Sequence, residues 1–169
     1  DTVVVGQPQY VLSSRTDNGG AAFVFQRDQG GPDAWGQVAR LAADPPAPNS
    51  RFGDAVALDG DTIVVGAWNE DSDDSPPLLA AGAAYIFAQD QGGASDWELT
   101  RILVASDAAA FDNFGAAVAV AGDSIWVGAR YSDGSGSGSI TMPHEEVRDY
   151  FYQRQNYLHE LDTAAEDLT

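Results

Sequence analysis

A 16-residue stretch that occurs twice constrains the fold of this chain more than any other feature. Residues 52–67 read FGDAVALDGDTIVVGA, and residues 114–129, which start 62 positions later, read FGAAVAVAGDSIWVGA. The second half of the motif occurs once more at residues 1–6, as DTVVVG. A repeated unit of this kind cannot bury its hydrophobic face alone, so the repetition predicts a fold of stacked, similar units.

Flanking segments recur with the motif and extend it to a unit of four short strands. Gly20–Phe25 (GAAFVF) corresponds to Gly82–Phe87 (GAAYIF). A polar loop follows each of them, and a tryptophan then opens a further apolar segment, Trp35–Ala42 in one copy and Trp97–Val104 in the other. β-Branched and aromatic residues between Gly- and Asp-rich turns predict strands. Four short strands per repeat, with glycines and aromatics at fixed places, are typical of a β-propeller blade.

The repeat predicts a mostly β fold for residues 1–142. We expect a truncated blade at 1–50, a complete repeat at 51–112 and a partial repeat at 113–142. Together they predict a partial β-propeller of about two to three four-stranded antiparallel blades. Propellers typically have about four to eight blades, so the sheets at both ends of this stack are expected to be open.

The repeat pattern stops at Pro143, which falls where Phe87 stands in the complete copy. Residues 143–169 instead carry apolar residues at spacings of three and four, which predicts a C-terminal amphipathic α-helix with Pro143 at its first position. Three roles stay open: the apolar face packs on the chain's own exposed sheet, it inserts into a partner's groove, or the end is chimeric or frame-altered. For the second role, the candidate partner-binding residues are Val147, Phe151, Tyr157, Leu158 and Leu161.

The four tryptophans have different expected roles. Trp35 and Trp97 repeat at one structural place, so we expect them to anchor the packing of the blades. Trp126 takes the place of Val64 within a strand and is expected in the core. Trp68 follows the end of a strand, where it could be exposed, and it is the candidate ligand-contact residue.

The charge of the chain is strongly one-sided, with 26 acidic residues against 8 basic ones and a formal net charge of −18. Binding of nucleic acid or of an anionic membrane needs clustered Lys and Arg, so the composition excludes both kinds of partner and favours cations and basic proteins. An Asp-rich surface without lysine is also typical of a salt-adapted protein. No apolar run approaches the roughly 20 residues that span a bilayer. The absence of cysteine excludes disulfides and thiolate metal sites.

On these motifs the chain resembles the FG-GAP repeat family, the modules of the integrin α-subunit propeller and of many microbial surface proteins. The matching positions are Phe52-Gly53, Val65–Ala67 and Gly82–Phe87, then Phe114-Gly115, Val127–Ala129 and Gly138–Met142. The resemblance covers residues 1–142. It implies a propeller, an extracellular or cell-surface location, and a role in adhesion or protein recognition instead of catalysis.

One departure from the integrin type concerns metal binding. That type has a calcium loop of the form D-x-D-x-D-G-x-x-D between the FG strand and the GA strand. Here the loop has shrunk to Leu58–Asp61 and to Val120–Asp123, and we expect Asp59-Gly60 to form a two-residue hairpin because both residues tolerate positive φ. A tight turn cannot supply the about six to eight oxygen ligands that calcium prefers. The chain therefore looks closer to the bacterial, loop-shortened form of the repeat.

The densest acidic cluster of the chain is the candidate metal site. Asn69, Asp71 and Asp73 place oxygen ligands at alternate positions, like the start of a calcium loop, so Ca²⁺ is the one cofactor considered. The glycine at position six and the terminal bidentate acid of such a loop are absent, and the alternative is a solvated acidic loop. Asp107 and Asp112 present a similar choice between capping a turn and joining a cation site, and turn capping is the commoner role of Asp.

No catalytic motif stands out, and we expect no enzyme. His144 and His159 lie 15 positions apart, too far for a paired helical ligand set. The predicted function is a non-catalytic cell-surface or secreted protein-interaction or adhesion module that self-assembles through open blade edges and the helix. One alternative is a carbohydrate- or cation-binding module that uses blade-end loops with Trp68. Another is a fragment of a larger propeller hydrolase.

Overall fold

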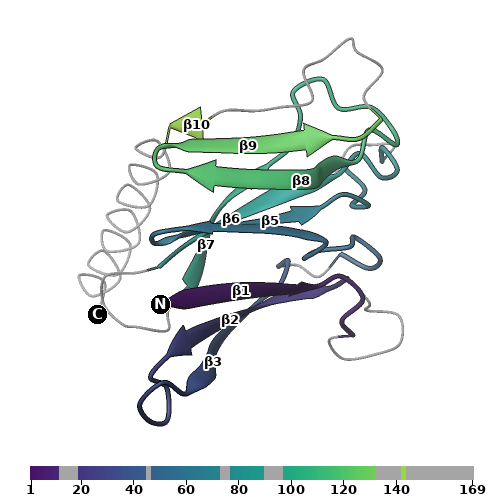
Figure 1. The fold of residues 1–169 in the computed structure, drawn as a ribbon. Helices are drawn as coiled ribbons and strands as arrows, with labels where there is room; N and C mark the ends of the chain where they lie inside the picture. The colour runs from purple at the N-terminus through teal and green to yellow at the C-terminus, as the bar shows by residue number, and fades with distance from the viewer. Residues whose placement is uncertain (12–18, 45–46, 73–76, 90–96, 132–141, 144–169) are drawn as a thin grey trace, which may run out of the picture.

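The computed structural model of the chain is mostly β, with three antiparallel sheets that follow one another along the sequence and lie side by side (Figure 1). The structure describes residues 1–11, 19–44, 47–72, 77–89, 97–131 and 142–143. The predicted helix and its five partner-binding residues, Val147, Phe151, Tyr157, Leu158 and Leu161, lie outside the described residues.

The middle sheet is the complete repeat and confirms the predicted four-stranded unit. Its strands are β4 (Ala55–Asp59), β5 (Thr62–Ala67), β6 (Ala83–Gln89) and β7 (Trp97–Leu103), paired in the order β4-β5-β6-β7. β5 and the first part of β6 are buried throughout because a neighbouring sheet covers each of their faces. Strands that are buried on both faces read as continuous apolar runs, and this accounts for the sequences TIVVGA and AAYIF.

The first sheet contains the counterparts of the last three of these strands. It consists of β1 (Thr2–Gln7), β2 (Ala21–Arg27) and β3 (Trp35–Leu41), with β1 at one edge. A register shift between Val24 and Phe25 repeats at the equivalent place in β6, between Ile86 and Phe87. β1 corresponds to β5 of the complete repeat, which pairs with β4 on one edge and with β6 on the other. Within the described residues, β1 pairs with β2 alone, and no strand pairs with its other edge.

The third sheet begins like the middle one, with β8 (Phe114–Ala121) and β9 (Ser124–Ala129), and ends with β10 (Met142–Pro143) on the edge next to β9. Met142 lies opposite Ile125, as Phe87 lies opposite Ile63 in the middle sheet.

Two predictions about Pro143 are therefore wrong. Met142, not Pro143, takes the place of Phe87, and Pro143 belongs to a strand instead of starting a helix. Proline has no N–H to donate to a neighbouring strand, and β10 tolerates it because it lies at the edge of its sheet.

The hairpin between β4 and β5 also differs from the prediction by one residue. Asp59 pairs with Thr62, so the central residues of the turn are Gly60 and Asp61, and only Gly60 has a positive φ, of 53°. A glycine at the first central position is the arrangement of a type II′ turn. Asp59 instead ends the strand, and its Oδ2 accepts a hydrogen bond of 2.6 Å from the N–H of Gly122 in the equivalent turn of the third sheet.

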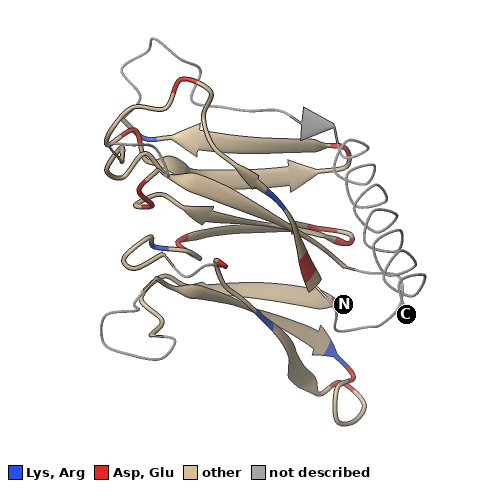
Figure 2. Cartoon of the chain, turned by 180° about the vertical axis from the view of Figure 1, so that it is seen from behind, with Lys and Arg blue, Asp and Glu red and all other residues tan. Residues whose placement is uncertain are grey.

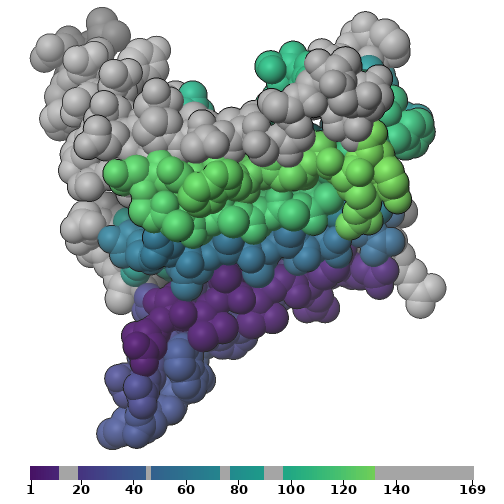
Figure 3. All heavy atoms as spheres, turned by 45° about the horizontal axis from the view of Figure 1, so that its top comes forward, coloured from purple at the N-terminus to yellow at the C-terminus, as the bar shows by residue number. Residues whose placement is uncertain are grey.

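Two hydrophobic layers separate the three sheets. Alternate side chains of β5 point in opposite directions, so Ile63 and Val65 belong to the layer between the first and middle sheets while Val64 belongs to the layer between the middle and third sheets. Acidic residues lie mainly at turns and strand ends, and most of each sheet is uncharged (Figure 2). In the space-filling view the sheets form successive layers with the first sheet at one end (Figure 3).

We name the two faces of each sheet by their neighbours. The leading face is turned toward the preceding sheet, and in the middle sheet it comprises Ile63, Val65, Tyr85, Phe87 and Trp97. The trailing face is turned toward the following sheet, and in the middle sheet it comprises Val64, Ala84, Ile86 and Leu103.

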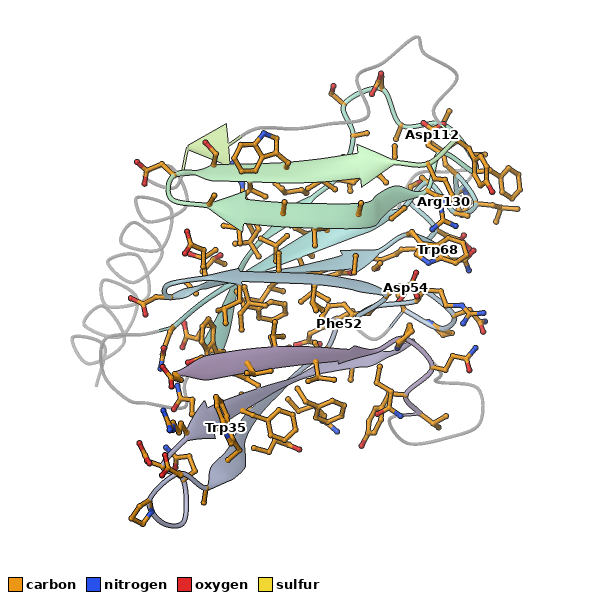
Figure 4. All side chains as sticks on the ribbon, viewed as in Figure 1. Trp35, Phe52, Asp54, Trp68, Asp112 and Arg130 are labelled. Carbon is orange, nitrogen blue, oxygen red and sulfur yellow. The ribbon has the colours of Figure 1, made fainter. Side chains whose placement is uncertain are left out.

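The Phe-Gly dipeptides join each sheet to the one before it. Phe52 forms an isolated parallel bridge with Gly20, and Phe114 forms the same bridge with Gly82. Both phenylalanines are fully buried, and Phe52 lies between the first and middle sheets (Figure 4). The FG half of the motif in one repeat therefore contacts the GA strands of the repeat before it.

Candidate interaction surfaces

Loops from two repeats meet at one end of the sheets. The loop after β5 and the loop before β8 are joined by backbone hydrogen bonds from the N–H of Phe111 to the carbonyl of Leu79, at 2.8 Å, and from the N–H of Asn113 to the carbonyl of Ala80, at 3.1 Å. The Asn113 side chain also donates to the carbonyl of Trp68, at 3.3 Å. We call the surface formed by these two loops, by Asp54 just before β4 and by the residues just after β9 the blade-end surface. Sequence reasoning missed Asn113, which holds both loops and has a φ of 57° that asparagine tolerates.

Trp68 lies on the blade-end surface and is held by two charged residues. Its indole N–H donates a hydrogen bond of 2.7 Å to Asp54 Oδ2, just before β4. The guanidinium carbon of Arg130, just after β9, lies 5.7 Å from the centre of the ring, within the range of a cation–π contact. Figure 4 shows the three side chains close together. A ligand would therefore meet Trp68, which is partly buried, together with the exposed side chains of Asp54 and Arg130.

Two of the three predicted metal ligands hold the loop that carries them. The Asn69 side chain donates to the carbonyl of Asn49 at 2.9 Å, and Asp71 Oδ1 accepts the N–H of Ala80 at 2.8 Å. Asp73 lies outside the described residues. In the described part of the chain, no three acidic, His or Cys side chains come together as a metal site. Calcium binding stays a prediction.

Asp112 caps a turn, as its sequence context predicts. Its Oδ2 accepts the N–H of Ala109 at 2.9 Å, and its own N–H donates to the carbonyl of the same residue at 3.3 Å. Its carbonyl accepts the N–H of Tyr131 at 3.1 Å, which ties the end of the third sheet to the same turn. Asp107 is exposed.

Three large apolar side chains are exposed on the blade-end surface. Leu79, Phe111 and Tyr131 are 52%, 59% and 67% exposed. The backbone of Phe111 is hydrogen-bonded to that of Leu79, and the backbone of Tyr131 to that of Asp112, the residue after Phe111. Phe111 has a φ of 70°, which is unusual for a bulky residue, so the turn that presents it is strained. Sequence reasoning missed this group. The available signal is that Phe111 stands where the preceding repeat has Asn49, which has a similar φ of 63° and belongs to a residue type that adopts this conformation more readily.

A second apolar surface is the leading face of the first sheet. It comprises the residues equivalent to the leading face of the middle sheet, namely Val3, Val5, Phe23, Phe25 and Trp35. Val3, Val5 and Trp35 are 43%, 48% and 48% exposed, whereas their counterparts Ile63, Val65 and Trp97 are 0%, 0% and 9% exposed. Figure 4 shows Trp35 on the side of the first sheet that faces away from the middle sheet.

Two predictions about tryptophans are wrong for one shared reason. The sequence predicts that Trp35 packs between blades and that Trp126 lies in the core, whereas Trp35 is 48% exposed and Trp126 is 41% exposed. Their counterparts Trp97 and Val64 are buried because neighbouring sheets cover both faces of the middle sheet. Within the described residues, no further sheet covers the leading face of the first sheet or the trailing face of the third.

Comparison with known proteins gives the family of the repeats. A family model described as FG-GAP repeat matches residues 35–87 and 97–140, which together make up more than half of the chain. The chain belongs to the FG-GAP repeat family. The Phe-Gly and Gly-Ala dipeptides of this FG-GAP chain are the residues at which neighbouring sheets touch, so its motif marks the joint between repeats.

Short stretches of the FG-GAP chain are also similar to bacterial regulators. It is 92% identical over 40 residues to the HTH-type transcriptional regulator RamB of Mycobacterium tuberculosis, which is 24% of this chain and 8% of the regulator. It is 72% identical over 27 residues to the HTH-type transcriptional regulator PrpR of the same species, which is 16% of this chain and 6% of that protein. The chain thus spans 8% and 6% of the lengths of these regulators. Transcriptional regulation is a property of those proteins and is not assigned to this chain.

The described part of the chain includes no helix that is long and apolar enough to cross a membrane.

Proposed function

We propose that this FG-GAP chain is a non-catalytic protein-interaction or adhesion module of the cell surface or the extracellular space. Its main binding surface is the leading face of the first sheet. The observation that carries this proposal is the contrast between equivalent positions, which are buried in the middle sheet and open in the first. Clustered aromatic and β-branched residues are typical of the core of a protein–protein interface, and Arg27 and Arg40 lie beside them on the same sheet.

The charge of the chain sets the conditions for binding. With a formal net charge of −18, two copies repel each other at low ionic strength. At about 1 M salt the Debye length falls to about 3 Å, and apolar contacts decide the association. The module is therefore expected to bind basic or uncharged partners at ordinary ionic strength, and to associate with itself at high salt.

Sedimentation velocity of the full chain tests the proposal. We expect the mean sedimentation coefficient to rise with protein concentration in about 1 M salt, and Trp35→Ser to reduce this rise. The matched control is Phe111→Ser, which removes an exposed aromatic side chain from the blade-end surface. A wild-type chain that stays monomeric at about 100 µM, where even weak specific contacts with a Kd near that value would show, contradicts the proposal. An equal loss in both variants also contradicts it.

A second candidate function is ligand binding at the blade-end surface, and the exposed side chains of Leu79, Phe111 and Tyr131 favour it. Aromatic side chains can stack on a carbohydrate ring or fill a pocket of a partner protein. In that case Phe111→Ser, and not Trp35→Ser, removes the binding.

A further inference from the structure

We propose that the blade-end surface, where the loops of the middle and third sheets meet, binds a cationic and partly apolar segment of another protein. The proposal rests on the second candidate function, whose surface it shares and whose ligand class it names. It does not depend on binding at the leading face of the first sheet.

The chain forms the same kind of joint twice. At the second joint, between the middle and third sheets, the N–H of Tyr131 donates to the carbonyl of Asp112 at 3.1 Å. At the first joint, between the first and middle sheets, the N–H of Asn69 donates to the carbonyl of Ser50 at 3.1 Å. Both joints also contain the parallel bridge made by the phenylalanine of a Phe-Gly pair. The first joint therefore shows which features of the second the fold requires.

The second joint exposes apolar side chains where the first joint has polar residues. The fold does not require the apolar residues, because the first joint forms with Asn49 and Asn69 at two of the same places. The residues that correspond at a spacing of 62 positions are Leu79 and Asp17, Phe111 and Asn49, and Tyr131 and Asn69.

Phe111 is strained where it stands. Its φ is 70°, and that of Asn49 at the equivalent place is 63°. Asparagine adopts this left-handed conformation much more readily than an aromatic residue does. A strained residue that the fold does not need is an indication of a functional site.

Charge also distinguishes the two joints. The two loops of the second joint, residues 68–82 and 104–113, contain six acidic residues and no basic residue. The equivalent loops of the first joint, residues 8–20 and 42–51, contain two acidic and two basic residues. The second joint therefore attracts cations, and the fold does not require this charge either.

The acidic groups of the second joint suit a segment with several cations better than a single metal ion. Asp71 and Asp107 are exposed and lie on different loops. In the part of the chain that the structure describes, no three acidic, His or Cys side chains gather as a metal site. Aromatic faces bind ammonium and guanidinium groups by cation–π contacts. Arg130, 5.7 Å from the centre of the Trp68 ring, is an example on this surface (Figure 4).

The cationic segment comes from another protein because this chain does not supply one. Its eight basic residues are all arginines, and no two of them are fewer than six positions apart. A second copy is an unfavourable partner at ordinary ionic strength, because both copies have a formal net charge of −18.

The probe is the capped hexapeptide KLKLKL, titrated calorimetrically into the full chain at about 0.1 M salt. The control peptide KSKSKS has the same charge and no large apolar side chain. We expect saturable binding of KLKLKL, and binding of KSKSKS that is at least about tenfold weaker, which corresponds to about 1.4 kcal/mol.

The double variant Phe111→Asn/Tyr131→Asn removes two aromatic side chains and leaves the net charge unchanged. It has the residues of the first joint at both places, so we expect it to fold. We expect it to bind KLKLKL at least about tenfold more weakly than the wild type. Trp35→Ser on the leading face is the control and should bind like the wild type. Phe111→Asn alone should not lower the melting temperature, because asparagine relieves the strain.

Five results would overturn the proposal. They are the absence of saturable KLKLKL binding, equal binding of the two peptides, equal binding by the wild type and the double variant, loss of binding in Trp35→Ser, and a lower melting temperature of Phe111→Asn. Equal binding would show non-specific attraction to an acidic chain. Hydroxyl-radical footprinting of the free chain adds one more: if Phe111 and Tyr131 resist oxidation, other segments of the chain cover the surface.

The neutral oligosaccharide cellohexaose separates this proposal from the second candidate function. If cellohexaose binds, the double variant loses that binding and KLKLKL does not bind, the proposal falls and the second candidate function stands. If neither ligand binds, both fall.

Discussion

The carbonyl oxygen of Gly115 lies 2.0 Å from the position that a β-carbon on Gly66 would occupy. The same relationship joins Gly53 and Gly6, at 1.9 Å, one repeat earlier. In each pair, the glycine that follows the phenylalanine meets the glycine near the end of the second strand of the preceding repeat. Neighbouring sheets can approach this closely only where neither residue has a side chain.

Replacing Gly66 by alanine should therefore push two sheets apart. We expect Gly66→Ala to lower the free energy of unfolding by about 3 kcal/mol, because the clash is with backbone atoms that cannot move aside. Urea unfolding followed by circular dichroism measures the change.

The matched control is Gly60→Ala in the hairpin turn. Gly60 has a φ of 53°, and an added β-carbon there would meet nothing within 4 Å, so only backbone strain of about 1 to 2 kcal/mol is expected. If Gly66→Ala costs no more than Gly60→Ala, the close contact between the sheets is not as described.

The constant spacing of 62 residues between the two copies of the motif predicts most of the fold, because equivalent residues in the two copies are expected to lie in equivalent strands. It does not predict which equivalent positions are buried, since burial depends on whether a neighbouring sheet is present. Trp35 and Trp97 illustrate this: the same residue at the same place is exposed in one sheet and buried in the next.

The blade-end surface is predictable only in part. The turn cap at Asp112 follows from local sequence, and its hydrogen bonds confirm it. The exposed position of Phe111 depends on a positive φ that an aromatic residue rarely adopts, so composition gives no indication of it.

Asp54 and Trp68 should stabilise each other across the blade-end surface. We expect a double-mutant cycle of Asp54→Ala and Trp68→Phe to give a coupling energy of about 1 kcal/mol, as for a single hydrogen bond to a charged group that is partly solvated. Thermal or urea unfolding of the four proteins measures it. Additive effects, with no coupling, would show that the indole N–H does not bind Asp54 in solution.

The calcium hypothesis for Asn69, Asp71 and Asp73 makes its own prediction. Isothermal titration with CaCl₂ should give a saturable heat that Asp71→Asn removes, because a neutral amide is a poorer ligand than a carboxylate. Asp59→Asn, which changes an acidic residue of the β4–β5 hairpin, should retain the heat. A titration without heat, together with an unchanged melting temperature, contradicts the hypothesis.

Salt should stabilise the folded chain. The 26 acidic residues outnumber the basic ones by far, and their mutual repulsion is strongest in the compact state. Raising NaCl from about 0.1 to 1 M should raise the melting temperature by about 2 to 4 °C, which corresponds to about 1 kcal/mol for a domain of this size. A melting temperature that is independent of NaCl would show that charge repulsion is unimportant for this fold.

Hydroxyl-radical footprinting of the full chain at low and high protein concentration in about 1 M salt tests the central claim most directly. The claim is that the leading face of the first sheet is the main binding surface. We predict that oxidation of Trp35 falls as the chain associates, while oxidation of Tyr131 on the blade-end surface stays the same. Protection of Tyr131 with unchanged oxidation of Trp35 would contradict the claim.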